Sequence, residues 1–292
     1  MKTYLNEFLK TCEYCAADRI FLTDTYERIA SHAKTAELWE SAIAIYRENI
    51  SCDFRKIVTL ADKAGALLGI HPYTAELLIF ICLTKYLREE YEKRGVDTAI
   101  WLDTVLDLKY KNEECKLVKG RVGSFVTEWF FKFFDMTRFA LGRLQFQIID
   151  FGHEYEKNGV KLTPQTKVID VHIPRSLKPL DEKSCDEAFA LAKQFFSDEI
   201  DGNCAFVCHS WLLYPEHETI LSHESNIYHF MKRFDIIKSG VSHSKGDLWR
   251  LFDTDEKDPE KLPSDTTMRR AYVNHLKNGG KVGWGFGVFI LP

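Results

Sequence analysis

The chain has 292 residues, of which 45% are hydrophobic and 28% charged, and its formal net charge is −4. Intrinsic disorder is excluded, because 21 Phe and 6 Trp among many aliphatic residues can bury a large apolar core. The longest apolar stretch, around Leu77–Leu83, is far shorter than the ~20 residues of a membrane-spanning helix, and the absence of a basic run disfavours nucleic acid as the main partner.

The first residues and the cysteines bear on the cellular compartment. The segment MKTYLNEFLK lacks the apolar core of a signal peptide, so we expect a cytoplasmic protein whose eight cysteines are reduced thiols. Cys12 and Cys15 have the spacing of a zinc-binding pair. Cys204, Cys208 and His209 form a second candidate group. Neither group has the four ligands of a tetrahedral zinc site, so we expect no metal site. We expect the cysteines to be buried apolar thiols instead.

The first 135 residues are predicted to form one helix after another. Three segments rich in helix-forming residues come first: 17–31, 35–50 and 52–68. The next helix begins at His71-Pro72, with proline at the first helical position, and ends at Gly95. Asp97 is the predicted N-cap of the helix after it. The segment Phe125–Phe134 is aromatic on all sides, which predicts burial at the junction with the following domain.

After about Thr137 the pattern changes to strands separated by helices. The alternation in Leu144–Ile148, the turn Asn158-Gly159 and the run Val168–Ile173 predict two strands with a hairpin turn between them. The remaining predicted elements, in chain order, are a helix from Asp181, a buried strand Cys204–Tyr214, a short helix near Ser225-Asn226, a strand Asp247–Phe252, a helix Asp265–Lys277 and a last strand Val282–Ile290. This order predicts an α+β protein with an all-helical domain over 1–135 and a mixed-sheet domain over 136–292 that includes a parallel strand pair.

Five stretches of the second half carry a resemblance to a known family. They are Val168–Pro174, His209–Leu213 before Pro215, Ser225–Ile227 leading to Arg233-Phe234, Leu262–Thr266, and Ala271–His275 ahead of Gly279-Gly280. Together with the element order, they resemble the GNAT acyltransferase fold with an additional helix between its last two strands. They are also similar to a bacterial family that pairs a helical N-terminal domain with a GNAT-like C-terminal domain, so the resemblance spans the whole chain.

The resemblance implies where an acyl-CoA binds. In GNAT enzymes two adjacent parallel strands separate, the pantetheine arm lies between them, and the pyrophosphate contacts backbone N–H groups at the start of the next helix. Transferred to this chain, the strands are Val168–Ile173 and Cys204–Tyr214, and the helix start lies in Arg175–Asp181. The implied contacts to acetyl-CoA or another acyl-CoA are Ile173, Arg175, Ser176, Ser210 and Asn226.

Two features depart from the family pattern. The usual glycine-rich phosphate loop is absent, and Asp181 with Glu182 places negative charge where the phosphates are expected. The tyrosine that often acts as general acid is also missing, because Arg233-Phe234 stands at the corresponding turn. Tyr228 and Tyr214 are the candidate substitutes, and Tyr228 is our choice for the catalytic acid.

Amide formation from a thioester needs a neutral amine, a stabilised oxyanion and a proton for the thiolate. His172 lies two residues from Asp170 on the same strand face, and a neighbouring carboxylate favours a general base. His209 lies in the middle of the partner strand. We therefore predict that both histidines and Asn226 approach one site. The alternative places the two histidines on opposite sides of the sheet as structural residues.

The expected function is transfer of an acyl group from an acyl-CoA to an amine of a small-molecule acceptor. The alternative is a sensor that binds an acyl-CoA or another metabolite on a GNAT-like domain without turnover. A hydrolase with Cys208 or Ser210 as nucleophile and His209 or His172 as base is disfavoured, because no G-x-S-x-G turn surrounds either nucleophile. In addition, Cys208 and His209 are adjacent in a strand and point to opposite faces.

Overall fold

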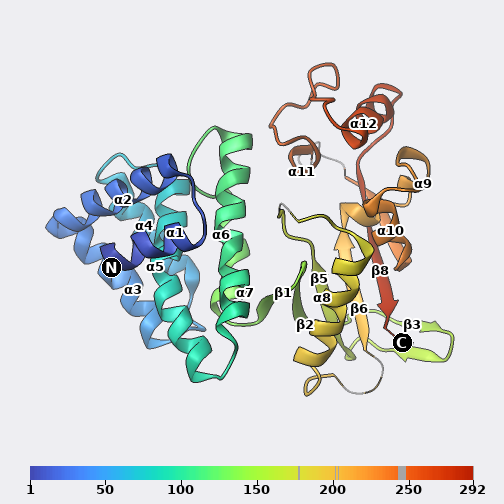
Figure 1. Ribbon diagram of the computed structural model, residues 1–292, viewed down its shortest axis with the longest axis horizontal. Helices are drawn as coiled ribbons and strands as arrows, with labels where there is room; N and C mark the ends of the chain where they lie inside the picture. Colours follow the sequence, from blue (N-terminus) through green and yellow to red (C-terminus); the bar gives the residue numbers. More distant parts are fainter. Residues whose placement is uncertain (177, 201, 203, 243–247, 292) are drawn as a thin grey trace. The chain divides into compact units, whose positions relative to one another are not determined.

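The computed structural model describes residues 1–176, 178–200, 202, 204–242 and 248–291. The chain forms two compact units, Met1–Phe139 and Ala140–Pro292. The first unit is built from helices, whereas the second contains a mixed β-sheet with helices packed on it (Figure 1). The predicted α+β class, with a helical region followed by a mixed sheet, is confirmed.

Six helices make up most of the first unit. They are α1 (Lys2–Thr11), α2 (Ala16–Ser31), α3 (Ala33–Glu48), α4 (Phe54–Ala66), α5 (Pro72–Lys93) and α6 (Thr98–Lys119). The side chains of Asp53, His71 and Asp97 accept backbone N–H bonds at the starts of α4, α5 and α6, which satisfies donors that a helix leaves unpaired. The prediction that Asp97 caps a helix is therefore confirmed.

The aromatic segment after α6 folds into the core of the first unit. It forms a 3-10 turn, η1 (Thr127–Phe130), and the short helix α7 (Phe131–Phe134). The ring of Phe80 on α5 lies 5.5 Å from that of Phe130 and 4.8 Å from that of Phe134, measured between centroids. Burial of this segment follows from its composition, and α5 provides the apolar surface that covers it.

The second unit contains a six-stranded sheet in the order β1-β2-β5-β6-β8-β7 and a separate hairpin, β3-β4. The strands are β1 (Arg138–Leu141), β2 (Leu144–Asp150), β3 (Tyr155–Lys157), β4 (Val160–Leu162), β5 (Lys167–His172), β6 (Ala205–Ser210), β7 (Asp235–Val241) and β8 (Gly283–Ile290). Asn158 and Gly159 form the predicted hairpin turn, with φ of +52° and +79°. β5 and β6 are parallel, whereas β2 with β5, β6 with β8 and β7 with β8 are antiparallel.

Of the predicted strands of this unit, one is wrong in part and another is wrong throughout. The run Cys204–Tyr214 does not continue as one strand, because β6 ends at Ser210 and a 3-10 turn, η2 (Trp211–Leu213), follows. Ser210 Oγ accepts the backbone N–H of Leu212 and so caps that turn. The stretch predicted as strand Asp247–Phe252 is helix α11 over Leu248–Phe252, and Asp247 lies outside the described residues. Its buried residues lie at helical spacing, which a five-residue apolar run cannot distinguish from a strand.

Helix α8 (Glu182–Phe195) covers one face of the sheet. The other helices of this unit are α9 (His217–Ile220), α10 (Asn226–Lys232), α11 and α12 (Thr267–Lys277), of which α11 and α12 share a separate apolar cluster. The ring of Phe189 on α8 contacts Phe146 of β2, Phe206 of β6 and Phe289 of β8 at centroid distances of 6.0, 4.8 and 5.0 Å, and α8 lies in front of the sheet in Figure 1. On the other face a separate cluster includes Val168, Val207 and Val288. The two clusters define two faces for the alternating side chains of each strand.

Three glycines alternate along β8 and allow the chain after β6 to pack directly on the strand. A Cβ atom added at Gly285 would lie 2.1 Å from the carbonyl oxygen of Leu213, and one added at Gly287 would lie 2.8 Å from Cβ of Phe234. Both distances are too short for real atoms, so this face of β8 has no room for side chains at these positions.

Replacing Gly285 by alanine is expected to lower the free energy of unfolding by about 1–3 kcal/mol, because the rigid backbone of η2 must move. The matched variant Gly287→Ala should be less destabilised, since its nearest contact, Cβ of Phe234, lies 2.8 Å away instead of 2.1 Å. Urea unfolding of both variants measures the difference. Equal stability of Gly285→Ala and the wild type would contradict the packing described for η2.

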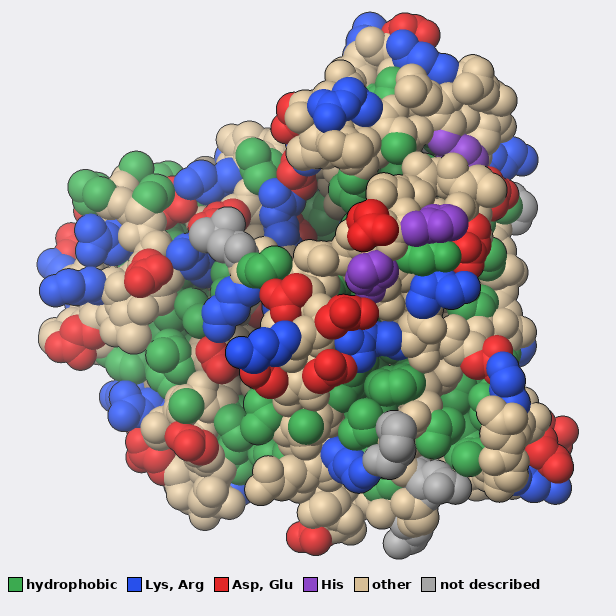
Figure 2. All heavy atoms as spheres, turned by 45° about the vertical axis from the view of Figure 1, so that its right-hand side comes forward, with side chains coloured by type: hydrophobic (Ala, Val, Ile, Leu, Met, Phe, Trp, Pro, Cys, Tyr) green, Lys and Arg blue, Asp and Glu red, His purple; other side chains and the backbone are tan. Residues whose placement is uncertain are grey.

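Positively and negatively charged side chains are interspersed on the surface. On the face shown in Figure 2, Lys and Arg side chains are interspersed with Asp and Glu side chains. This face therefore lacks the broad basic surface that phosphate backbones attract. Among the residues that the structure describes, no helix combines the length and apolar composition needed to cross a bilayer.

Candidate functional site

The sheet opens between β5 and β6 at their carboxyl ends. The parallel register pairs Ile169 with Phe206 and Asp170 with Val207. Beyond these pairs β5 stays bonded to β2 as far as His172, and β6 stays bonded to β8 as far as Ser210. The two strands thus part from each other while each remains anchored to an outer strand. Ligands of sheets with parallel strands collect at this edge.

His172 and His209 lie on the same face of the sheet at this opening. Asp170 and Val207 are register partners and therefore point to the same side. His172 lies two residues after Asp170, and His209 lies two residues after Val207. Because side chains alternate along a strand, both histidines point to the same side as Asp170 and Val207. The alternative arrangement, with the two histidines on opposite sides of the sheet, is wrong.

A carboxylate and an amide accompany His172. Its Nε2 lies 3.0 Å from Oδ2 of Asp170, and the Nε2 of Gln147 on β2 donates to the same oxygen at 2.8 Å. The His172 and Asp170 side chains are 19% and 13% exposed, so solvent and small molecules still reach them. An imidazole oriented by a carboxylate that is itself held by a neighbour is the arrangement of a general base.

His209 has a different environment. It is exposed, and its ring meets the edge of Trp284 at a centroid distance of 4.7 Å. Cys208, its neighbour in β6, is completely buried, and burial raises the pKa of the Cys208 thiol well above its usual value. A hydrolase in which Cys208 and His209 act as a pair is therefore excluded, because their side chains leave opposite faces of one strand.

The start of α8 lies directly after the loop that follows β5. Asp181 accepts the backbone N–H of Ser184 at 2.8 Å, and this bond holds the pKa of Asp181 below its usual range. Glu182 lies 3.7 Å from Nδ1 of His229 on α10. The negative charge that the sequence places near the expected phosphate position is thus partly bound by the chain itself.

The end of α10 packs on the start of α8. Arg233 donates to the carboxylate of Asp186 and to the carbonyl oxygen of Glu182, and His229 lies one turn earlier against the Glu182 carboxylate. Asn226 is the first residue of α10 and is exposed, and its approach to the two histidines stays a prediction.

Arg143 shapes the loop between β5 and α8, a role that the sequence did not reveal. Its side chain is buried, and it donates from Nε to the carbonyl oxygen of Pro179 at 3.0 Å and from a terminal nitrogen to that of Pro174 at 3.1 Å. One guanidinium thereby holds both ends of the loop. Within the loop, the hydroxyl of Ser176 donates to the carbonyl oxygen of Lys178 at 3.4 Å, and half-buried Ile173 leads into it.

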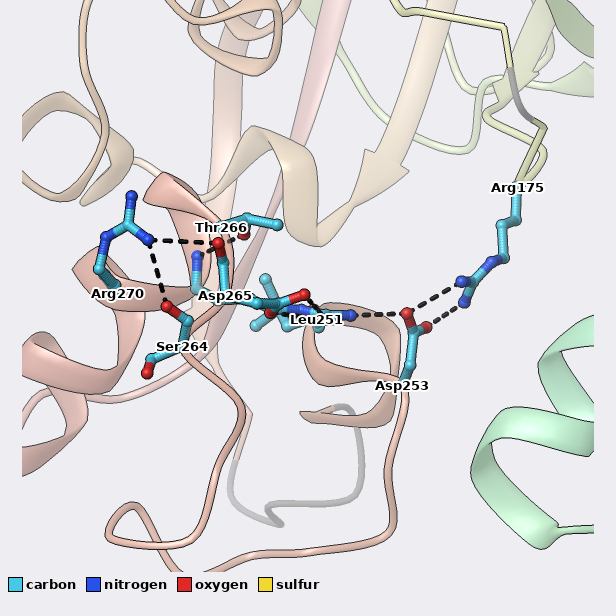
Figure 3. Close-up of polar contacts among 8 residues, drawn as sticks. Arg175, Leu251, Asp253, Ser264, Asp265, Thr266 and Arg270 are labelled. Carbon is cyan, nitrogen blue, oxygen red and sulfur yellow. Dashed lines mark hydrogen bonds and ion pairs between the residues drawn. The ribbon is translucent and has the colours of Figure 1, made fainter.

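Arg175, the expected phosphate contact, forms a two-bond ion pair with Asp253 (Figure 3). Asp253 also accepts from Arg269 at 2.6 Å. Sequence reasoning did not connect these residues, because Arg175 and Asp253 are 78 positions apart and only folding brings them together.

Tyr228, the expected general acid, donates its hydroxyl hydrogen to Glu218 at 2.9 Å. This hydrogen bond raises the pKa of Tyr228. The tyrosine ring stacks on His223, and Lys232 donates to the other oxygen of Glu218. The hydroxyl hydrogen is thus already shared with a carboxylate in a surface cluster.

A buried histidine that the sequence analysis did not single out lies behind η2. His217 is completely inaccessible, and its two ring nitrogens meet the carbonyl oxygen of Leu212 and the hydroxyl of Tyr272. Burial lowers the pKa of His217 to about 4. The neutral imidazole therefore links η2 to α12 in the core of the second unit.

Acid is expected to destabilise the protein through His217. The unfolded chain binds this proton near the ordinary histidine pKa of about 6.5, whereas the folded chain binds it only near 4. The stabilisation is present above pH 6.5 and is lost as the pH falls toward 4, and it amounts to about 3 kcal/mol. Melting temperatures measured from pH 7 to 4 should fall less steeply for His217→Gln than for the wild type. The surface variant His223→Gln should keep the wild-type slope, and equal slopes for all three proteins would contradict the assignment.

Comparison with known proteins agrees with this geometry. A model of a GNAT-like C-terminal domain matches residues 139–289, and a model of an N-acyltransferase N-terminal domain matches residues 3–136. The mixed sheet that opens between two parallel strands and the matching family models define an acyltransferase. The chain belongs to the N-acyltransferase family that combines these two domains, as the sequence resemblance predicted.

Solved structures of acyltransferases share the fold over nearly the whole chain. One is an acyltransferase mutant in complex with octanoyl-CoA, which has a TM-score of 0.74 and 20% sequence identity. Another is an acyltransferase in complex with decanoyl-CoA and teicoplanin, with a TM-score of 0.72 and 19% identity. In both cases the match covers 98% of this chain and 87% of the other. None of the curated proteins compared matches the chain.

Proposed function

We propose that this protein transfers an acyl group from an acyl-CoA to an amine of a small-molecule acceptor. The family assignment supports acyl transfer. The observation that carries the rest is the opening between β5 and β6 with His172 and His209 on one face. In this proposal the pantetheine arm lies between the strands beyond Asp170 and Val207, where the register between β5 and β6 ends.

The chemistry then uses the side chains at the opening. The neutral amine attacks the thioester carbonyl, and His172, oriented by Asp170, accepts the proton that the amine loses as the C–N bond forms. The C–S bond breaks, and CoA leaves with a proton on its sulfur. His209 faces the same side and is the proposed source of that proton. Backbone N–H groups at the parted strand edges stabilise the oxyanion.

The phosphates are proposed to lie at the loop before α8. A helix of 14 residues begins there, and its N-terminus favours negative charge. Arg143 holds the loop in shape, Arg175 and Ser176 come from it, and Asn226 is the further proposed contact. Ile173 and Ser210 flank the opening at the ends of the two strands. These residues together can bind the diphosphate without the glycine-rich loop of other GNAT enzymes.

The relatives support a medium-length acyl chain and a sizeable acceptor. The solved acyltransferases contain octanoyl-CoA or decanoyl-CoA, and one of them also contains teicoplanin. We therefore infer that this chain accepts acyl groups longer than acetyl and transfers them to an amine on a small molecule such as a glycopeptide.

Calorimetry and product analysis test the proposal. The full chain is titrated with CoA, acetyl-CoA, octanoyl-CoA and decanoyl-CoA, and then incubated with the thioester it binds best and a panel of amines that includes teicoplanin. Mass spectrometry should detect the new amide and free CoA. Thiol reagents are avoided because the chain has eight cysteines. Absence of binding at millimolar thioester would overturn the proposal.

The second candidate function is a non-catalytic acyl-CoA sensor. The cap that Asp181 forms on α8 and the engagement of Tyr228 by Glu218 favour it, because both remove groups that a GNAT enzyme uses. Tight thioester binding without any amide product across the panel would select this function over the transferase.

A further inference from the structure

A chain of alternating charges links the loop after β5 to the segment between β7 and β8. Arg175 pairs with Asp253 through both terminal nitrogens, and Asp253 accepts in addition from Arg269 at 2.6 Å (Figure 3). The side chains of Arg175 and Asp253 are 36% and 18% exposed. The pair is thus accessible to a competing anion, although most of both side chains is shielded from water.

The topology places this ion pair at the edge where β5 and β6 part. Arg175 leaves the sheet after β5. Asp253 follows α11, which comes after β7, and β7 runs in the same direction as β6 because both are antiparallel to β8. The carboxyl end of β7 is therefore at the same edge as that of β5. Since β6 and β8 lie between them in the sheet, the ion pair joins segments from the two sides of the opening.

Asp253 is held in place without help from Arg175. Arg269 donates from Nε to the carbonyl oxygen of Leu251 at 3.1 Å and from a terminal nitrogen to Asp265 at 2.9 Å, while its other terminal nitrogen binds Asp253. These bonds lie within α11, α12 and their flanks. The carboxylate of Asp253 therefore keeps its position if Arg175 changes partner.

We propose that Asp253 is an internal substitute for the phosphates of acyl-CoA. It binds the guanidinium of Arg175 in the free protein, and the CoA diphosphate replaces it when the thioester enters. A phosphate offers the guanidinium the same two-bond, charge-assisted geometry as a carboxylate. The exchange releases α11 from the loop after β5. Asp253 thus sets the affinity for the thioester, and this inference rests on the proposed function.

The variant Asp253→Asn tests the proposal. Asparagine tolerates the left-handed backbone at this position, where φ is +56°, and it keeps the shape of the side chain. By calorimetry, decanoyl-CoA should bind about fivefold to tenfold more tightly to this variant, as expected for loss of one partly exposed competing ion pair. S-decanoyl-N-acetylcysteamine, which lacks the phosphates, should bind both proteins equally.

Two further variants separate the proposal from a general effect of charge. Asp265→Asn removes a carboxylate that binds Arg269 but has no bond to Arg175, so it should leave the affinity for decanoyl-CoA unchanged. Adding Arg175→Gln to Asp253→Asn should abolish the gain. In the wild type, decanoyl-CoA should speed amide hydrogen exchange in the α11 peptide Leu248–Phe252.

The outcomes distinguish this inference from the proposed function. If the wild type binds decanoyl-CoA and Asp253→Asn binds it no more tightly, the inference is overturned and the proposed function stands. If only Asp253→Asn binds, both are supported. If neither protein binds any thioester, the proposed function fails and the inference fails with it.

Discussion

Replacing His172 by alanine is expected to lower kcat for amide formation by roughly 100-fold, which is the usual loss when a general base is removed. The reason is the environment of the imidazole, which lies 3.0 Å from Asp170 while Gln147 binds the same carboxylate oxygen. Binding of decanoyl-CoA should change little, because the contacts proposed for the phosphates and the pantetheine arm are made by other groups. Rapid-quench or steady-state kinetics with detection of the amide by mass spectrometry measures the effect.

Two controls decide whether this loss is chemical. Gln147→Leu removes the amide that holds Asp170 and should reduce kcat by a smaller factor than His172→Ala, since the base itself remains. Melting curves of His172→Ala should stay close to those of the wild type. A lower melting temperature with unchanged turnover per folded molecule would identify His172 as a structural residue.

Replacing His209 by alanine is expected to lower kcat by a similar factor, roughly 100-fold, if this side chain returns the proton to the CoA thiolate. His209 is exposed and its ring is perpendicular to that of Trp284, so the substitution removes little buried surface and should leave folding intact. The matched variant Trp284→Phe keeps an aromatic contact and should retain most of the activity.

Changing the acidity of the leaving thiol tests the role of His209 more directly. A thioester whose thiol is more acidic than that of CoA needs less help from an acid, so His209→Ala should lose less activity with such a thioester than with decanoyl-CoA. His172→Ala should lose the same factor with both. Equal losses for the two variants with both thioesters would contradict the separate roles.

Local signals in the sequence were sufficient for most of the fold. Asp97 caps α6, and Asn158-Gly159 forms the turn between β3 and β4. Both were predictable because helix caps and tight turns depend on interactions within a few residues. The segment Leu248–Phe252 was predicted as a strand because five apolar residues carry too little periodicity to tell the two structures apart. β7 was missed, since it lies at the edge of the sheet and Asp235–Val241 mixes apolar, charged and small residues.

Of the candidate site, only the residues that lie on strands could be predicted from the sequence. The spacing of Asp170 and His172 along one strand fixes their common face, and the parallel register adds His209 to it. The partners of Arg175 depend on how a segment 78 residues later folds back. Arg143 was hidden for the same reason, because its acceptors are backbone carbonyls that carry no sequence signature.

The short ladder between β5 and β6 has a mechanical consequence. The sheet consists of two three-stranded halves, β1-β2-β5 and β6-β8-β7, which the register joins only at Ile169–Phe206 and Asp170–Val207. Rotating one half against the other about this junction breaks no hydrogen bond within either half. The distance between the imidazoles of His172 and His209, which lie on different halves, depends on the angle at this junction. The Phe189 ring of α8 packs against both halves and so supports one angle. In the proposed reaction this angle sets the spacing between the proton acceptor and the proton donor.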